Sequence, residues 1–188
     1  MNPKLKEVND LYLQIQDYID PTVEYLAGLT EEQRLELESN ADEHLRLYEI
    51  AIEKYREVAP ALSPDEIIEG YKQGCRLLQR TLSGHMCYAF DKVYIPIMIQ
   101  AVRNDEAHTA YLFVQSLADH LGKEIAPLVI EALDSESALT RERALAVVRQ
   151  LELVEALPTV RGMVNDPYLE ISYLAKDILN RWEGGTKE

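Results

Sequence analysis

The second half of the chain repeats its pattern of apolar and polar positions every 31 residues. Prolines lie at this spacing, at Pro96, Pro127 and Pro158, and each opens a short apolar run. Self-similarity at such a period is typical of stacked helical arrays. The pattern therefore predicts three structural repeats within residues 92–183. Two further sets of positions keep the phase and are apolar in every copy: Phe113, Ala144 and Ala175, and Leu117, Val148 and Leu179.

Each repeat predicts two helices joined by a polar turn. Proline suits the first turn of the first helix, because the N–H that it lacks would have no partner within the helix. Apolar residues follow at helical spacing. The second helices are expected to begin near Thr109, Thr140 and Ile171. We expect burial of Leu133, Val148 and Leu179 between repeats, and of Phe113, Ser116, Leu117 and His120 in the first copy.

The middle copy carries the most complete pattern. It reads Pro127-Leu-Val-Ile-Glu-Ala-Leu-Asp134, followed by Leu139-Thr-Arg141, Ala144-Leu145 and Val148. This pattern resembles the HEAT repeat family, especially its short-repeat, phycobilin-lyase-like branch, over residues 93–183. The resemblance implies an α-α superhelix of helical hairpins. In that family the aspartate that closes a first helix and the arginine that opens a second form a ladder. Only Asp134 and Arg141 fill both roles here, because Ala110 and Ser172 occupy the arginine position in the outer copies, so we expect the ladder to be absent.

Residues 1–91 show no clear copy of the repeat but carry helical patterns of their own. Thr30-Glu-Glu-Gln33 and Ser63-Pro-Asp-Glu66 are capping-box signatures that open helices. The first predicts a long helix to about Val58, and the second a helix that continues to Leu82. Their expected apolar seams are Leu37, Ala41, Leu45, Tyr48, Ile52, Tyr55 and Ala59, and Ile67, Tyr71, Cys75, Leu78 and Leu82; an earlier seam is Leu5, Val8, Tyr12, Ile15 and Ile19.

These patterns together predict one all-α domain over residues 1–188. Residues 1–91 form an N-terminal helical extension, residues 92–183 three HEAT-like repeats, and residues 184–188 a frayed tail. Gly70 and Gly74 lie four residues apart in the second capped helix. Because glycine costs about 1 kcal/mol relative to alanine inside a helix, we expect a neighbouring helix to pack closely there.

The formal net charge of −14 limits the classes of partner. An acidic surface repels phosphate backbones, whose binding depends on lysine and arginine contacts. We therefore expect no nucleic acid and no anionic membrane as partner, and a protein partner that is basic remains open. The first residues lack the apolar stretch of a signal peptide, and Cys75 and Cys87 are too few for a disulfide framework. A cytoplasmic protein is the simplest expectation.

Catalytic and metal-binding motifs are absent from the sequence. The four histidines are scattered, with no His-Glu-x-x-His or Cys-x-x-Cys pattern. The His-Glu dipeptides of the HEAT-repeat di-iron hydroxylases do not occur. Cys75 and His85 could be considered as a nucleophile and its base, but their spacing in the sequence does not bring them into contact. We predict a non-enzymatic protein with no catalytic residue, no cofactor and no metal.

The predicted binding surface is the concave face that the second helices form, since stacked helical repeats bind partners along such faces. Its expected contact residues are Tyr111, Gln115, Glu142, Arg149, Tyr173, Asp177 and Asn180. Two other candidates are the junction Leu82–Phe90 and the acidic segment Glu31–Glu43. The predicted function is a protein-interaction module, in a narrower version an acidic inhibitor or immunity-type protein for a basic partner. The alternative is a chromophore- or small-molecule-handling protein, which the resemblance to bilin lyases implies.

Overall fold

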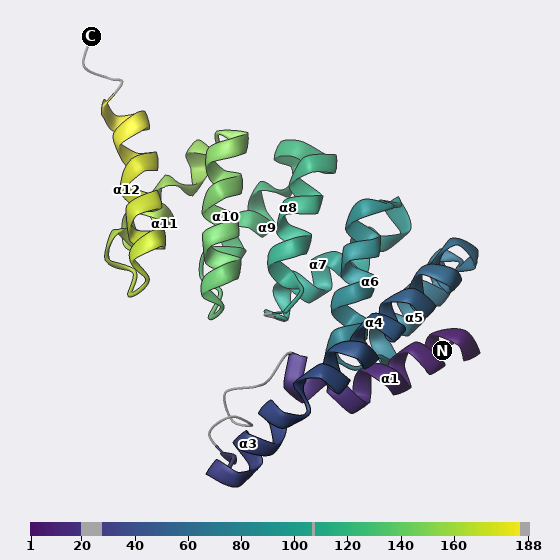
Figure 1. Cartoon of the computed structure of the whole chain (residues 1–188). Coiled ribbons are helices and arrows are strands. Elements are labelled where there is room, and N and C mark those ends of the chain that lie inside the picture. The colour runs from purple at the N-terminus through teal and green to yellow at the C-terminus, as the bar shows by residue number, and fades with distance from the viewer. Residues whose placement is uncertain (20–27, 107, 185–188) are drawn as a thin grey trace. The chain divides into compact units, whose positions relative to one another are not determined.

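The computed structural model describes residues 1–19, 28–106 and 108–184. Every regular element in those ranges is helical, so the expected all-α class is confirmed. The chain divides into two compact units, Met1–Ala89 and Phe90–Glu188. The helices are α1 (Pro3–Ile19), α3 (Glu31–Ser39), α4 (Ala41–Val58), α5 (Pro64–Gln73) and α6 (Arg76–Tyr88), then α7 (Ile95–Arg103), α8 (Ala110–Leu121), α9 (Ala126–Ala132), α10 (Ala138–Leu151), α11 (Leu157–Gly162) and α12 (Leu169–Gly184) (Figure 1).

The C-terminal unit contains three successive helix pairs, α7 with α8, α9 with α10, and α11 with α12. Helix α10 packs on both α8 and α12, while α7 packs on α9 (Figure 1). Pro96, Pro127 and Pro158 each lie at the second position of the first helix of a pair. A short 3₁₀ segment precedes each of these helices, which repeats the local geometry at the same spacing as the prolines.

In the middle of this unit the residues predicted to be buried are buried, but two other predicted core residues are not. Leu133 and Val148 are 1% and 0% exposed, as predicted. Leu179 is only half-buried, because α12 closes the series and packs on α10 and α11 without a further pair. His120 is exposed in the last turn of α8, where its ring stacks on Phe90 at 3.8 Å between centroids.

Polar contacts join the loops of successive pairs. The Arg141 guanidinium donates to the carbonyls of Ser135 and Glu136 in its own loop, at 2.8 and 2.9 Å. It also binds Asp166 in the following loop, with Nε 2.9 Å from Oδ2. Arg141 therefore pairs with the carboxylate of the next repeat, whereas Asp134 forms no ion pair among the described residues.

In the N-terminal unit, α1 packs on α4 and α6, and α5 packs on α6. The apolar seam of α1 is confirmed at its first four positions: Leu5, Val8, Tyr12 and Ile15, each at most 1% exposed. Its fifth position, Ile19, has a side chain outside the described set. Gly70 also behaves as expected, since a Cβ there would lie 2.9 Å from Leu5 Cδ1 and 3.0 Å from Leu82 Cδ1.

Both long helices predicted for this unit are broken. The first stops at Ser39 and restarts at Ala41, and the second stops at Gln73 and restarts at Arg76. Gly74 therefore ends α5 rather than lying inside a helix. At the second break, Asn9 Oδ1 accepts a 2.7 Å hydrogen bond from the Cys75 amide and caps α6 from a distant helix. A tertiary cap of this kind makes the corner between α5 and α6 stable.

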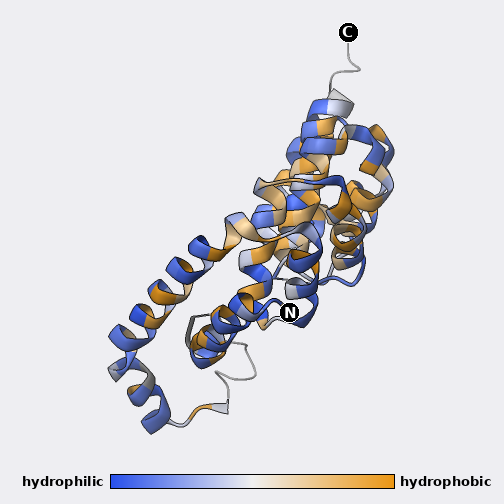
Figure 2. Ribbon diagram, turned by 90° about the vertical axis from the view of Figure 1, so that its right-hand side faces the viewer, coloured by the Kyte–Doolittle hydropathy of each residue, from blue (hydrophilic) through white to orange (hydrophobic). Residues whose placement is uncertain are grey.

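The predicted seam of the first long helix is also shifted. Ala51 and Val58 are the buried positions of α4, whereas Leu45 is 52% exposed. Leu37, the first seam residue, has a side chain outside the described set. Figure 2 shows that α3 and the start of α4 are largely hydrophilic. Among the residues the structure describes, no helix is both long and apolar enough to cross a membrane.

Candidate partner-binding surface

The seven residues expected to contact a partner lie on three helices that pack side by side, α8, α10 and α12 (Figure 1). All seven are at least partly exposed. Because the helices start at corresponding points of successive repeats, equal spacing along the sequence becomes one row across the unit. The row consists of Tyr111 and Gln115 on α8, Glu142 and Arg149 on α10, and Tyr173, Asp177 and Asn180 on α12.

Three of these residues share one hollow of about 440 Å³. We call this hollow the helix groove, since α8, α10 and α12 all contribute to its walls. Tyr111, Glu142 and Arg149 were predicted from the sequence. The residues that sequence reasoning missed are Leu139, Arg143, Ala146, Glu170 and Leu174. Leu139 is 56% exposed, so the groove presents an unburied apolar side chain.

The four remaining predicted residues lie outside the helix groove and bind their neighbours or the solvent. Gln115 bridges to Asp119 and Gln150, each at 2.8 Å. Asp177 pairs with Arg181 at 3.1 Å and with Arg149 at 3.7 Å. Tyr173 is 67% exposed, and the Lys176 ammonium lies 5.7 Å from its ring centroid. Asn180 is exposed. The structure therefore unites three of the seven predicted residues and places the others around them.

A second hollow of about 360 Å³ adjoins the helix groove. We call it the loop-side hollow, because residues just before α10 and α12 line it. Leu139, Glu142 and Glu170 line both hollows and so mark their junction. Tyr168 lines the loop-side hollow, and the Arg141 guanidinium lies 5.6 Å from its ring centroid. This contact holds an exposed aromatic ring in a defined place.

The charges of the helix groove are largely unused within the protein. Glu142 and Glu170 form no ion pair and no side-chain hydrogen bond among the described residues. Within the part of the chain that the structure describes, Arg143 donates only to the Gln115 amide oxygen, at 3.3 Å. Charged groups without internal partners keep their hydrogen-bonding capacity for a ligand. The groove thus combines apolar walls with carboxylates and a guanidinium that a partner can satisfy.

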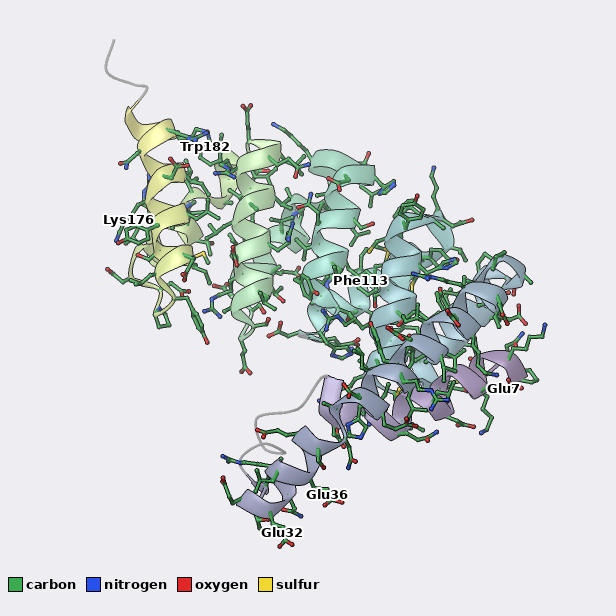
Figure 3. All side chains as sticks on the ribbon, in the orientation of Figure 1. Glu7, Glu32, Glu36, Phe113, Lys176 and Trp182 are labelled. Carbon is green, nitrogen blue, oxygen red and sulfur yellow. The ribbon has the colours of Figure 1, made fainter. Side chains whose placement is uncertain are left out.

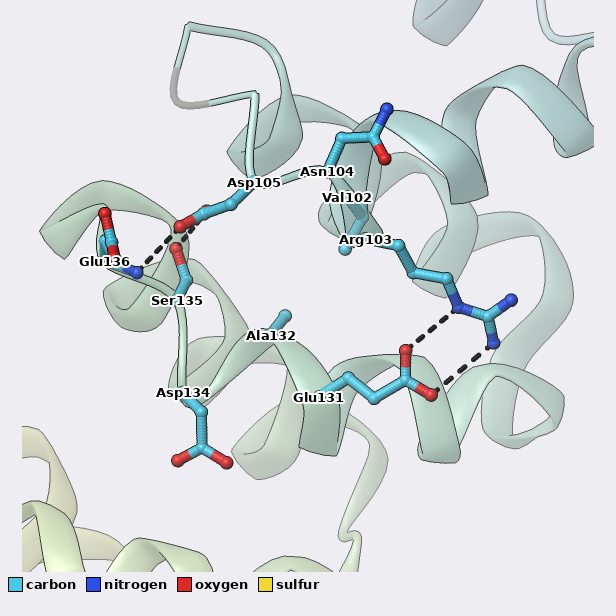
Figure 4. A pocket seen from close by; sticks show the side chains of 9 residues that line it. All are labelled: Val102, Arg103, Asn104, Asp105, Glu131, Ala132, Asp134, Ser135 and Glu136. Atoms are coloured by element: carbon cyan, nitrogen blue, oxygen red, sulfur yellow. Dashed lines mark hydrogen bonds and ion pairs between the residues drawn. The ribbon is translucent and has the colours of Figure 1, made fainter.

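A different hollow, of about 450 Å³, lies where α7 and α9 end (Figure 4). Its polar groups mostly bind one another. Arg103 Nε pairs with Glu131 at 3.0 Å. Asp105 accepts hydrogen bonds from Ser135 Oγ and, at 2.7 Å, from the Glu136 amide. Among the described residues, no group of three or more histidines, cysteines or carboxylates is placed to hold a metal ion. These contacts join the loops to one another. Fewer polar groups are therefore free to bind a ligand here than in the helix groove.

The junction Leu82–Phe90 continues α6 as far as Tyr88. The Tyr88 side chain is 96% exposed. His85 Nδ1 lies 2.8 Å from the Tyr55 hydroxyl, and burial lowers the pKa of His85. Cys75 lies ten residues before His85, about 15 Å along a helix, and burial raises the pKa of its thiol. Cys75 and His85 therefore do not lie close enough to act as a nucleophile and its base.

The acidic segment Glu31–Glu43 forms α3 and the first turn of α4. Its carboxylates are exposed, and Glu32 and Glu36 project outward from α3 (Figure 3). Glu43 pairs with Arg46 at 3.4 Å. Carboxylates in a first helical turn complement the helix dipole, as Glu31 and Glu32 do in α3. The segment is a solvated source of negative potential.

Comparison of the chain with protein-family models, with curated proteins and with solved structures gave no match.

Proposed function

We propose that this protein is a non-enzymatic interaction module that binds a polypeptide partner through the helix groove and the exposed side chains around it. The observation that carries the proposal is the groove itself: three successive second helices form one hollow with apolar side chains and with two carboxylates, Glu142 and Glu170, that have no ion-pair partner among the described residues. In this proposal the C-terminal unit is an α-α superhelix of HEAT-like repeats. Such repeats bind partners along the face that their helices share.

The side chains on this face are of the kinds that anchor interfaces. Tyrosine and arginine contribute more to binding than other residues, because they bury a large area with a polar end that can be satisfied. Tyr111 and Arg149 line the helix groove, and Tyr168 and Tyr173 are 54% and 67% exposed nearby. Exposed apolar groups gathered in one place also mark interaction sites. Leu139 supplies such a group at the junction of the two hollows.

The charge of the chain favours a basic partner, and the narrower proposal is an acidic inhibitor or immunity-type protein. The net charge is −14. Glu36, Asp42 and Glu43 are exposed on α3 and α4. Opposite charge on a partner would speed its encounter with this protein even if those carboxylates lie outside the final interface.

The chromophore-handling alternative has less support. Small-molecule sites enclose their ligands in mostly apolar walls with few polar groups. Four of the eight residues that line the helix groove are charged: Glu142, Arg143, Arg149 and Glu170. A polypeptide, which carries its own charges and hydrogen-bonding groups, fits these walls better than a chromophore does.

The proposal is tested by capturing partners from a lysate of the source organism with the immobilised protein, followed by purification of the captured protein and a binding measurement. Leu139→Asp places a charge at the groove without removing a core residue. Val154→Asp is the matched control, because Val154 is 60% exposed and lines neither hollow. We expect Leu139→Asp to abolish capture and Val154→Asp to leave it unchanged. A partner that binds both variants like the wild type would place the interface elsewhere.

A further inference from the structure

We propose that the junction between the helix groove and the loop-side hollow binds an arginine side chain of the partner, with apolar partner residues on both sides of it. This inference rests on the proposed function and adds the chemistry of the segment that is recognised. It starts from the three residues that line both hollows: Leu139, Glu142 and Glu170.

The two carboxylates come from different helices. Glu142 lies in the second turn of α10, and Glu170 in the first turn of α12. Neither forms an ion pair among the described residues, because Arg149 pairs with Asp177, Arg141 pairs with Asp166, and Arg143 donates to Gln115. A cation at the junction of the two hollows would be attracted by both negative charges. The junction is therefore an unfilled position for positive charge.

Arginine suits this position better than lysine. A guanidinium presents five N–H donors in a planar fork, so its two edges can serve carboxylates on two different helices. Hydrogen bonds between ionised partners are also stronger than those between neutral ones. An ammonium concentrates its charge at one point and satisfies such a pair less well. We therefore expect arginine first and lysine as a weaker substitute.

Apolar side chains line the hollow on either side of the junction. Tyr111, Ala146 and Leu174 line the helix groove, and Ala138, Tyr168 and Ile171 line the loop-side hollow. Arg143 and Arg149 line only the helix groove, so a second cation on that side would be repelled. The recognised segment thus has a single arginine at its centre and apolar residues before and after it.

The experiment is selection of peptides from a displayed library of random dodecamers on the immobilised full-length protein. The double variant Glu142→Lys with Glu170→Lys reverses the charge of the junction. The control is Glu124→Lys with Glu155→Lys, which makes the same change in net charge at exposed positions that line neither hollow. Circular dichroism verifies that both variants keep the helical content of the wild type.

We expect the wild type and the control to select arginine flanked by apolar residues. The selected peptides should bind the junction variant about tenfold to a hundredfold more weakly, which is the range for lost hydrogen bonds between charged groups. Peptides that depend on Leu139 but carry no central cation, or that keep their affinity for the junction variant, would overturn this inference and leave the proposed function standing. Failure to select any peptide that depends on Leu139 would overturn both.

Discussion

Arg141 and Asp166 form a two-pronged ion pair between successive repeats, with Nε–Oδ2 and Nη2–Oδ1 distances of 2.9 and 3.2 Å. Both side chains are mostly buried, at 12% and 7% exposed. The same guanidinium donates to the carbonyls of Ser135 and Glu136. A single side chain therefore satisfies acceptors in two consecutive loops, and the loss of its carboxylate partner would leave a buried charge only partly compensated.

Asp166→Ala should destabilise the protein by about 3 kcal/mol, because breaking a mostly buried pair from one side leaves the other charge without its partner. Urea unfolding followed by circular dichroism measures the effect. Asp134→Ala is the matched control, since Asp134 is exposed and lies one repeat earlier, and its effect should stay within about 0.5 kcal/mol. Equal effects of the two changes would contradict the role assigned to Asp166.

The stabilisation from Asp166 should also depend on pH. Burial raises the pKa of this carboxyl, but hydrogen bonds from Arg141 and the Tyr168 amide, together with the Arg141 charge, outweigh burial and lower the pKa. A group whose folded pKa is lowered stabilises above its unfolded pKa, about 3.9 for aspartate, and this is lost as pH falls through the folded pKa. The difference between wild type and Asp166→Asn should therefore shrink in acid, as urea midpoints across that range would show.

Thr140→Val should stabilise the protein by about 1 kcal/mol. Thr140 is fully buried, and its Oγ1 has no hydrogen-bond partner among the described residues. Valine keeps the shape and removes a hydroxyl whose burial without a partner costs free energy. Ser172→Ala is the contrasting variant, because Ser172 Oγ donates to the Val164 carbonyl at 2.6 Å. Ser172→Ala should therefore lower the urea midpoint. A lower midpoint for Thr140→Val would contradict the prediction, because it would show that the Thr140 hydroxyl has a hydrogen-bond partner.

His85 should make the N-terminal unit less stable in mild acid. Burial lowers its pKa, so the unfolded chain takes up the proton at a higher pH than the folded one. The resulting stability is present above the unfolded pKa of about 6.5 and is lost as pH falls through the folded pKa. In His85→Gln, the urea midpoint should change less between pH 7.5 and pH 5 than in the wild type. If the urea midpoint of His85→Gln changes with pH as much as that of the wild type, titratable groups other than His85 cause the pH dependence.

Binding of the partner should divide into steering and anchoring contributions. Glu36→Lys, Asp42→Lys and Glu43→Lys together should mainly lower the association rate, most clearly at low salt, where the Debye length exceeds about 10 Å. Tyr173→Ala should mainly raise the dissociation rate, because aromatic anchors hold a complex together. Surface plasmon resonance with the captured partner, at low and high salt, separates the two. Association and dissociation rates that are unchanged in both sets of variants would contradict a binding site on this face of the protein.

The repeat period was enough to predict the helix pairs of the C-terminal unit and the buried residues in their centre. Leu133 and Val148 are buried because positions one period apart meet the same neighbours in every pair. The period says nothing about where the series stops, so Leu179 was misassigned, and it does not mark the exposed last turn of α8, so His120 was misassigned. In the N-terminal unit, apolar spacing continued across Asn40 and Gly74 and hid two helix ends, although asparagine and glycine are residues that commonly end helices.

The candidate site was predicted in part for a related reason. Helical spacing assigns Tyr111, Glu142 and Arg149 to one face, and these residues do meet in the helix groove. It cannot assign Leu139 and Glu170, which lie in the first turns of their helices and reach the hollows through the way that α10 and α12 pack. The hollows depend on the relative placement of neighbouring helices, which a single helical period does not contain.

The hydrogen bond from the Cys75 amide to Asn9 has a consequence for the order in which the chain acquires structure. Its two ends are 66 residues apart, so α6 receives its cap only after α1 has docked. During synthesis α1 leaves the ribosome before α6, so the part of α1 that packs on α6 stays uncovered until the segment through Tyr88 follows. Contacts so distant in sequence slow folding because the intervening chain must be closed. The C-terminal unit, whose helices pack mostly on near neighbours, can assemble pair by pair as it emerges.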